Sequence, residues 1–293
     1  MYDIAKYEEA YTIEEAIALL KANPQAVIIA GGSDVLIKLH EGRMPEAQLI
    51  SIHGIPELKG VKVEADGTIV IGAGTSFSQI ARSTIIQQHL AVLGDAVSMV
   101  GGPQIRNIGT IGGNVCNGVT SADSAATLFA LNARLRIQGA NTERVISIHD
   151  FYQGPGKVAL AHGEILTAIL VTKDNYDGFH GHYIKYALRN AMDIATLGCS
   201  AVCKFAGRQV VEFRLALGVA APTPLRCRKT EEIAKGRTVD AGLLEEIGKA
   251  AITEVSPRTS WRASREFRLQ LVEELSKRAF LEAYRRAGGE VKC

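Results

Sequence analysis

The sequence lacks the marks of several large protein classes. No apolar run approaches the roughly 20 residues of a membrane-spanning helix, and the opening MYDIAKYEEAYTIEEAIALL lacks the apolar core of a secretory signal. Neither charge sign dominates, with 33 Lys and Arg against 31 Asp and Glu. This balance predicts neither nucleic acid nor an anionic membrane as a partner. We therefore expect a soluble cytoplasmic protein.

Cysteine and the familiar catalytic and nucleotide motifs are also scarce. The five cysteines are odd in number and scattered, which favours reduced thiols; they are Cys116, Cys199, Cys203, Cys227 and Cys293. Cys199 and Cys203 share one face of a predicted strand without further ligands nearby, so buried structural cysteine is preferred over a metal site. The histidines, His180 and His182 among them, show no ligand spacing and are expected to face solvent. No G-x-G-x-x-G or G-x-x-x-x-G-K-[ST] motif occurs, and no Ser/His/Asp constellation can be assembled.

The 293 residues, 47% of them hydrophobic, suffice for one large domain or two ordinary ones. Thr12 and Glu15 form a capping box for an amphipathic helix that ends near Asn23. The β-branched run 27–30 predicts a buried strand that stops at Gly31 and Gly32. Ser33 or Asp34 then caps a second helix.

Further along, the pattern predicts an α+β chain of two lobes. We expect strands at 48–52, 68–72, 133–138, 143–148 and 164–171, and a helix over 76–100. Residues 101–123 hold six glycines and show no helical period. A charged segment near residue 176 predicts the boundary between domains 1–176 and 177–293. Strands at 183–190, 197–205 and 210–219 follow, then helices at 241–255 and 264–286, the last ending at Gly288 and Gly289.

Two glycine turns carry the predicted chemistry. The first glycine segment (residues 30–34, AGGSD) follows a predicted strand and begins a predicted helix. The second (residues 109–114, GTIGGN) also contains a Gly-Gly pair followed by a polar residue. Glycine lets backbone N–H groups approach a ligand closely, and several such groups near a helix N-terminus bind phosphate. Two such segments could hold the two phosphates of a dinucleotide. A single Gly-Gly after a strand is more often an ordinary turn, and the two segments together make a ligand site and ordinary turns equally good interpretations.

These segments belong to a longer set of motifs that resembles the flavin-binding medium subunits of molybdenum hydroxylases, and among them those of the xanthine dehydrogenase type. The matches run through the whole chain in order: AGGSDVL at 30–36, GPQIRNIGTIGGNVCNG at 102–118, SADS at 121–124, GPGK at 154–157, EIL at 164–166, KYALRNAMDIA at 185–195, GVAAPTPLRC at 218–227 and SWRASREFRLQL at 260–271.

The resemblance implies a fold and a cofactor site. The fold is α+β: a vanillyl-alcohol-oxidase-type (PCMH-type) FAD-binding domain of two lobes, then a C-terminal α/β domain of the CO dehydrogenase flavoprotein type. Both glycine segments would cradle the FAD pyrophosphate, with Asp123 on the adenosine side and Lys185 close to the flavin. The implied cofactor-binding residues are Val27, Ile28, Ile29, Ala30, Gly31, Gly32, Ser33, Asp34, Gly109, Thr110, Ile111, Gly112, Gly113, Asn114, Asp123, Ile165, Leu166, Ile184 and Lys185.

The resemblance also implies an oxidoreductase subunit that works inside a complex. Electrons would pass from a molybdopterin-containing large subunit, through [2Fe–2S] clusters on a small subunit, to the FAD of this chain and on to NAD⁺. No metal ligand and no acid–base residue is expected on this chain. Three alternatives remain. The first is a sibling in the same family whose complex acts on carbon monoxide, an aldehyde or a nicotinate-like substrate. The other two are a stand-alone FAD-dependent oxidoreductase and an assembly module without flavin.

Departures and isolated residues complete the expectations. No insertion for an extra iron–sulfur cluster is present, and the aromatic residue that covers the flavin in some relatives has no clear counterpart near Gly101. Arg106 is a candidate for a cofactor or interface role. Trp261 is expected at a domain or subunit contact. The C-terminal arginines are expected on the polar face of the last helix or at a subunit contact; they are Arg258, Arg262, Arg265 and Arg268.

Overall fold

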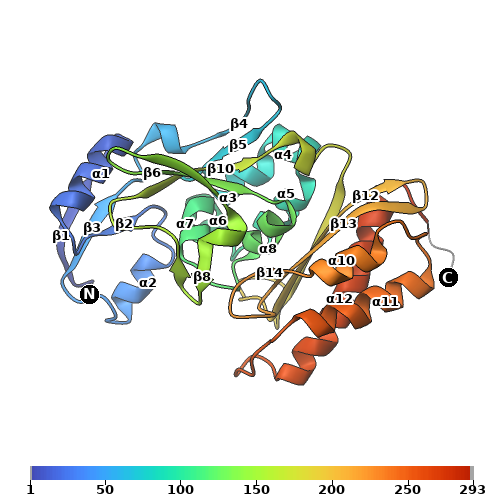
Figure 1. Cartoon of the computed structure of the whole chain (residues 1–293). Coiled ribbons are helices and arrows are strands. Elements are labelled where there is room, and N and C mark those ends of the chain that lie inside the picture. Colours follow the sequence, from blue (N-terminus) through green and yellow to red (C-terminus); the bar gives the residue numbers. More distant parts are fainter. Residues whose placement is uncertain (1, 291–293) are drawn as a thin grey trace.

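The computed structural model describes residues 2–290 and shows an elongated molecule, with the first strand and the last helix at opposite ends (Figure 1). The first lobe is a parallel three-stranded sheet of order β1-β3-β2 between two helices. Its elements are β1 (Ile4–Glu9), α1 (Ile13–Ala22), β2 (Val27–Ile29), α2 (Val35–His40) and β3 (Ala47–Ser51). Ile50 packs beneath α1, whereas Leu49 on the opposite face packs beneath α2. This is the period-two alternation expected of a strand covered on both sides.

The second lobe is a five-stranded antiparallel sheet of order β4-β5-β10-β6-β7. Its strands are β4 (Val61–Val63), β5 (Ile69–Gly72), β6 (Arg134–Gln138), β7 (Glu143–Ser147) and β10 (Ile165–Val171). The apolar face, which includes Ile71, Leu135 and Ile169, is covered by short helices. These are α3 (Phe77–Arg82), α4 (Thr84–His89), α5 (Ala91–Ser98), α6 (Pro103–Ile108), α7 (Ile111–Cys116) and α8 (Asp123–Ala130). The helix α9 (Ile148–Phe151) and the hairpin of β8 (Tyr152–Gly154) and β9 (Lys157–Val158) complete the lobe.

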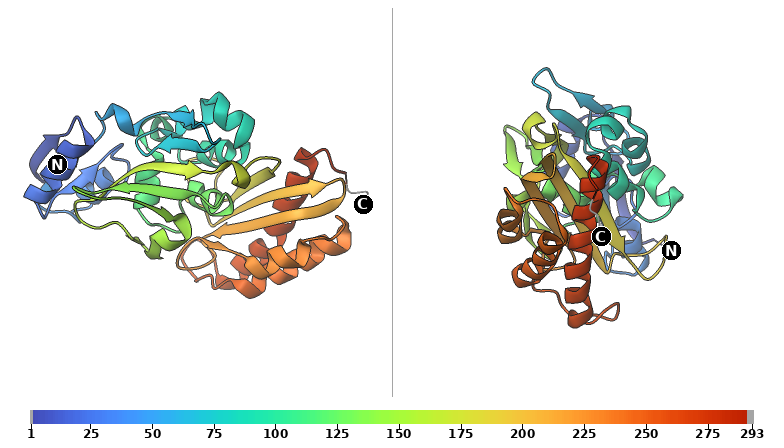
Figure 2. Two further views of the ribbon diagram at one scale, coloured as in Figure 1. Left: turned by 45° about the horizontal axis from the view of Figure 1, so that its top comes forward. Right: turned by 90° about the vertical axis from the view of Figure 1, so that its right-hand side faces the viewer.

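The C-terminal part is an antiparallel sheet of order β11-β12-β13-β14 between two helical layers. Its strands are β11 (His180–Tyr186), β12 (Leu197–Ala206), β13 (Gln209–Gly218) and β14 (Leu225–Arg226), and its helices are α10 (Arg228–Ala234), α11 (Ala241–Ala251) and α12 (Arg265–Arg286). Cys199 and Cys203 are fully buried on the face that meets α12, while Val202 joins the core of the second lobe. The sheet therefore connects the two halves of the molecule (Figures 1 and 2).

Some predicted elements have different bounds, each for a local reason. The helix predicted over 76–100 is three short helices, because the backbone turns away at Ser83 and Leu90. Two helices, α6 and α7, lie inside the glycine-rich stretch where none was predicted. The strand predicted at 183–190 is β11, which ends at Tyr186. β1 was not predicted, since its side chains are mostly exposed and show no apolar alternation.

The last helix ends where predicted, but one of its arginines, Arg268, is buried, whereas it was expected on the polar face or at a subunit contact. Ser264 caps α12 by accepting from Phe267 N, and Gly288 follows the helix with a φ of 83°. Arg268 does not lie on the polar face: it is 2% exposed and donates to Thr196 O and to Ser260 Oγ. It ties the start of α12 to β12.

Trp261 is 78% exposed beside the Arg262 guanidinium. Among residues 2–290, none of the helices has the length and apolarity needed to span a membrane.

Candidate functional site

The first glycine segment offers free backbone donors. It follows β2 at the carboxyl end of the parallel sheet, and Gly32 has a φ of 74°, which favours glycine. Within residues 2–290, the N–H groups of Gly31, Gly32, Ser33 and Asp34 donate to no protein acceptor. They precede or begin α2, where orphan N–H groups are normally satisfied by caps, water or a ligand. This is the donor arrangement that an anionic group requires.

The second glycine segment is built differently: it is not an open loop but the start of α7, capped by Thr110. Five of its N–H groups are used inside the protein, beginning with Gly109 N, which donates to Ile105 O at 2.7 Å. Ile111 N donates to Thr75 O at 3.1 Å and Gly112 N to Ala73 O at 2.8 Å. Gly113 N donates to Thr110 Oγ1 at 3.2 Å and Asn114 N to Thr110 O at 3.0 Å. Its donors therefore mostly stabilise the fold.

Two glycines in these segments allow close packing of the chain on itself. A Cβ on Gly31 would overlap the carbonyl oxygen of Ile108, and a Cβ on Gly112 would lie 2.6 Å from Ala73 O. A Cβ on Gly113 would meet only the Thr110 hydroxyl, at 3.0 Å. The first segment is thus pressed against the residues that lead into the second, and Gly113 faces the more open space.

Side-chain hydrogen bonds connect α7 to the first glycine segment on one side and to α8 on the other. Asn117, after the helix, donates from Nδ2 to Asp34 Oδ1 at 2.9 Å, which joins the two glycine segments. Asn114 Oδ1 accepts from Ser124 Oγ at 2.7 Å, which joins α7 to the start of α8. The next residue inward is Asp123, the first residue of α8.

Asp123 and Lys185 form a buried ion pair. Lys185 Nζ donates to Asp123 Oδ2 at 2.7 Å and to Met99 O at 2.9 Å, and the two side chains are 8% and 7% exposed. Burial raises the pKa of the Asp123 carboxyl, against the effect of the Lys185 ammonium. An ammonium group has three N–H donors, and within residues 2–290 the third has no acceptor.

This contact corrects one implied placement. Asp123 and Lys185 touch each other, so they cannot serve opposite ends of an extended FAD, with one at the adenosine and the other at the flavin. Ile184 lies on the other face of β11 from Lys185 and packs into the C-terminal core. Ile165 and Leu166 are 1% and 4% exposed, so both residues are buried within the protein.

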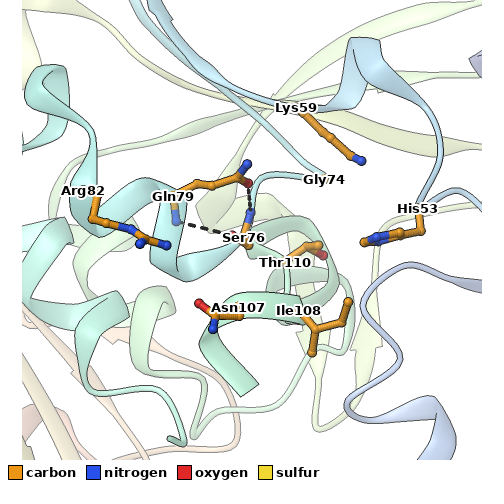
Figure 3. A pocket seen from close by; sticks show the side chains of 9 residues that line it. All are labelled: His53, Lys59, Gly74, Ser76, Gln79, Arg82, Asn107, Ile108 and Thr110. Atoms are coloured by element: carbon orange, nitrogen blue, oxygen red, sulfur yellow. Dashed lines mark hydrogen bonds between the residues drawn. The ribbon is translucent and has the colours of Figure 1, made fainter. Parts of the chain in front are cut away.

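Two cavities adjoin the glycine segments, and apart from Thr110, Ile29 and Ala30 their lining residues were not predicted. One, of about 460 Å³, lies beside Thr110 and Ile108 (Figure 3). His53 and the cationic side chains of Lys59 and Arg82 surround it, with Ser76, Gln79 and Asn107 between them. The second, of about 320 Å³, lies at the carboxyl ends of β1, β2 and β3, between Tyr7, Tyr11 and Ala30. No local motif marks these residues, because they come from elements that are far apart in the sequence.

The segment near Gly101 is held by groups of this chain. Arg106 donates from one guanidinium nitrogen to Val100 O at 3.0 Å and to Gly101 O at 3.3 Å. Met192 N donates to Gly101 O at 3.3 Å, and the Met192 thioether packs against Gly102. Arg106 therefore supports the backbone before α6.

Two family models of known proteins match successive parts of the chain. The family model described as "FAD binding domain in molybdopterin dehydrogenase" matches residues 3–173. The model described as "CO dehydrogenase flavoprotein C-terminal domain" matches residues 182–283. The chain belongs to the family of FAD-binding subunits of molybdenum hydroxylases, which confirms the predicted family, fold class and cofactor.

Individual relatives span the whole chain. The xanthine dehydrogenase FAD-binding subunit of Escherichia coli O157:H7 is 44% identical and covers 100% of both chains. The carbon monoxide dehydrogenase medium chain of Hydrogenophaga pseudoflava is 30% identical over 96% of this chain and 97% of that protein. The solved structure of carbon monoxide dehydrogenase from Hydrogenophaga pseudoflava, lacking the Mo-pyranopterin moiety, superimposes with a TM-score of 0.92 over 98% of this chain and 99% of that chain, at 30% identity.

The first glycine segment and the Asp123–Lys185 pair fit FAD. The free N–H groups of the first glycine segment suit a pyrophosphate, and the buried Lys185 retains one unused donor. Both are groups that a bound anionic cofactor would satisfy.

Proposed function

We propose that this chain is the electron-transferring flavin subunit of a xanthine or purine dehydrogenase complex. The observation that carries the proposal is the joint presence of four unpaired N–H groups at residues 31–34 and a buried lysine with an unused donor. FAD, when bound, supplies the hydride and electron chemistry. The protein contributes binding, orientation and charge.

We place the pyrophosphate at the first glycine segment, next to Asn114 and Gly113 on α7. Lys185 then lies at the flavin end, where its positive charge favours the anionic reduced ring. Asp123 lies at the same end and partly compensates that charge. The remaining residues predicted around both segments line this path mainly through their backbone. The predicted division at residue 176 stays part of the proposal, and the family matches on either side of it support it.

The proposed partners are a molybdenum-binding large subunit and a [2Fe–2S] small subunit, with NAD⁺ as the electron acceptor, in the cytoplasm. Support comes from the relatives, which are named as FAD-binding subunits and medium chains of dehydrogenases. The purine substrate is favoured because identity is 44% to the xanthine dehydrogenase subunit, against 30% to the carbon monoxide and nicotinate dehydrogenase chains. A sibling substrate is the second candidate.

The first test is the visible spectrum of the purified chain with added FAD, followed by excess NADH. We expect flavin absorption that stays with the protein and bleaches with NADH. Protein that retains no flavin would contradict the cofactor site in the isolated chain. Flavin that is reduced by dithionite but not by NADH would contradict NAD⁺ as the acceptor and leave the FAD site intact.

The substrate is tested on the complex, purified through a tag on this chain. We expect reduction of the flavin by xanthine or hypoxanthine, followed by the release of NADH. A complex whose flavin is reduced by carbon monoxide, an aldehyde or nicotinate, and not by a purine, would replace the purine assignment with the sibling one.

A further inference from the structure

The ion pair of Asp123 and Lys185 has a third member, Tyr183. Tyr183 and Lys185 are two residues apart on β11, so both point to the same face, toward the start of α8. The Tyr183 hydroxyl donates to Asp123 Oδ1 at 2.9 Å, while Lys185 occupies Oδ2 at 2.7 Å. Each carboxylate oxygen therefore has its own donor, and the carboxylate cannot rotate without losing one of them.

The hydroxyl is buried and keeps its proton. Tyr183 is 2% exposed, and burial together with the Asp123 charge raises the pKa of its phenol well above the usual value of 10. A phenol in this state is a permanent donor to the carboxylate. A bond from a neutral donor to a buried charge is also stronger than a bond between neutral groups.

A glycine on the next strand makes room for this hydroxyl. Gly198 on β12 pairs with Lys185 on β11, so it is the cross-strand neighbour of the lysine. A Cβ at Gly198 would lie 2.9 Å from the Tyr183 hydroxyl oxygen, closer than such atoms approach in folded proteins. Any other residue at 198 would push the phenol away from Asp123.

Asp123 in turn limits the freedom of Lys185. The ammonium is held between Asp123 Oδ2 and Met99 O, which leaves one N–H in a fixed direction. If the carboxylate turned, the ammonium would follow it, because a buried carboxylate without its cation is costly. The orientation of the lysine therefore depends on a tyrosine that does not touch it.

We propose that Tyr183 is a positioning residue for the cofactor site: its hydroxyl, admitted by Gly198, fixes the Asp123 carboxylate and thereby directs the free N–H of Lys185 toward FAD. The inference rests on the proposed function only in placing FAD beside Lys185. Tyr183 itself is not expected to touch the cofactor.

The test is Tyr183→Phe, which removes one oxygen and keeps the ring. We expect reduced FAD to lose about tenfold more affinity than oxidised FAD, which lowers the midpoint potential by about 30 mV for a two-electron couple. Binding of oxidised FAD, measured by fluorescence quenching, is expected to weaken several-fold. The matched control is Tyr176→Phe, whose buried hydroxyl donates to Gly67 O at 2.6 Å, away from Asp123. The control is expected to keep the wild-type potential and affinity.

Gly198→Ala provides a second, independent perturbation. It is expected to lower the potential in the wild-type background and to have much less effect in the Tyr183→Phe background, because the displaced hydroxyl is already absent. If Tyr183→Phe does not fold, Gly198→Ala decides alone through the same potential measurement.

Unchanged potential and affinity in a folded Tyr183→Phe protein would overturn the inference and leave Tyr183 as a packing residue. Additive effects of the two substitutions would do the same for the role of Gly198. Failure of the proposed FAD site has another signature, since the wild-type chain itself would then retain no FAD.

Discussion

In the part of the chain that the structure describes, the backbone N–H groups of residues 31–34 in the first glycine segment have no protein acceptor, whereas those of residues 111–114 in the second all donate within the protein. Both contain a Gly-Gly pair near the start of a short helix, α2 or α7. The difference arises because α7 lies against the five-stranded sheet, so Ala73 and Thr75 reach its first turn. The first turn of α2 has no such neighbour. A glycine pair therefore indicates a ligand only where the fold leaves its donors unused.

The largest expected effect is a loss of stability when Gly112, the more tightly packed of the two glycines in α7, is replaced. Gly112→Ala places a methyl group 2.6 Å from Ala73 O, which is backbone and cannot move away. We expect a loss of about 3 kcal/mol or more in the free energy of unfolding, measured by urea denaturation without FAD. A loss below about 1 kcal/mol would mean that the backbone here adjusts readily, which contradicts the tight packing.

Hydrogen exchange sharpens the contrast between the two segments. Without FAD, the N–H groups of Ile111 and Gly112 should exchange slowly, since both are bonded within the fold, while those of Gly31–Asp34 exchange fast. FAD at 100 times its Kd should slow the first segment by up to about 100-fold, or about 2.7 kcal/mol. Equal slowing of both segments would show that the second one also gives its donors to the cofactor.

Gly113 tests the more open side of α7. Gly113→Ala meets only the Thr110 hydroxyl, and alanine favours a helix, so the apoprotein should gain up to about 1 kcal/mol in stability. The methyl group would stand between α7 and the cofactor, and we expect FAD affinity to fall about tenfold, or about 1.4 kcal/mol. Gly94→Ala, in the middle of α5 with only an Ile86 methyl at 3.5 Å, is the matched control. Unchanged FAD affinity in Gly113→Ala would move the cofactor away from α7.

Elements with complete local signals were predictable, and those that depend on distant partners were not. Thr12 caps its helix as predicted, and β2 ends at Ile29, just before the predicted glycines, because the run of β-branched residues stops there. The helix α7 was missed because two of its six residues are glycines, which disfavour helix in isolation. It forms because Thr110 caps it and the neighbouring sheet buries Ile111 and Val115.

In the candidate site, too, some residues carry a local sequence signal and others come together only through the fold. The first glycine segment carries its own signal, since strand, glycines and helix follow one another in the chain. The contact between Asp123 and Lys185 joins residues 62 positions apart, and only the packing of the C-terminal sheet against α8 creates it. The resemblance named both residues and did not place them together. The cations of the larger cavity, Lys59 after β3 and Arg82 at the end of α3, come from separate elements and carry no local sequence signal.

The smallest expected effect concerns the bond that joins the two segments. Asn117 donates to Asp34 at the surface, so Asn117→Ala should cost only about 0.5–1 kcal/mol in the free energy of unfolding. Its consequence for FAD should be a two- to threefold weaker affinity, because the free donors of the first segment lose one of their supports against α7. The matched control is Asn23→Ala, whose side chain donates to Leu19 O and Glu8 in the first lobe, away from the glycine segments. If Asn117→Ala weakens FAD as strongly as Gly113→Ala, the two segments act as one unit, and the division of roles between them would have to be abandoned.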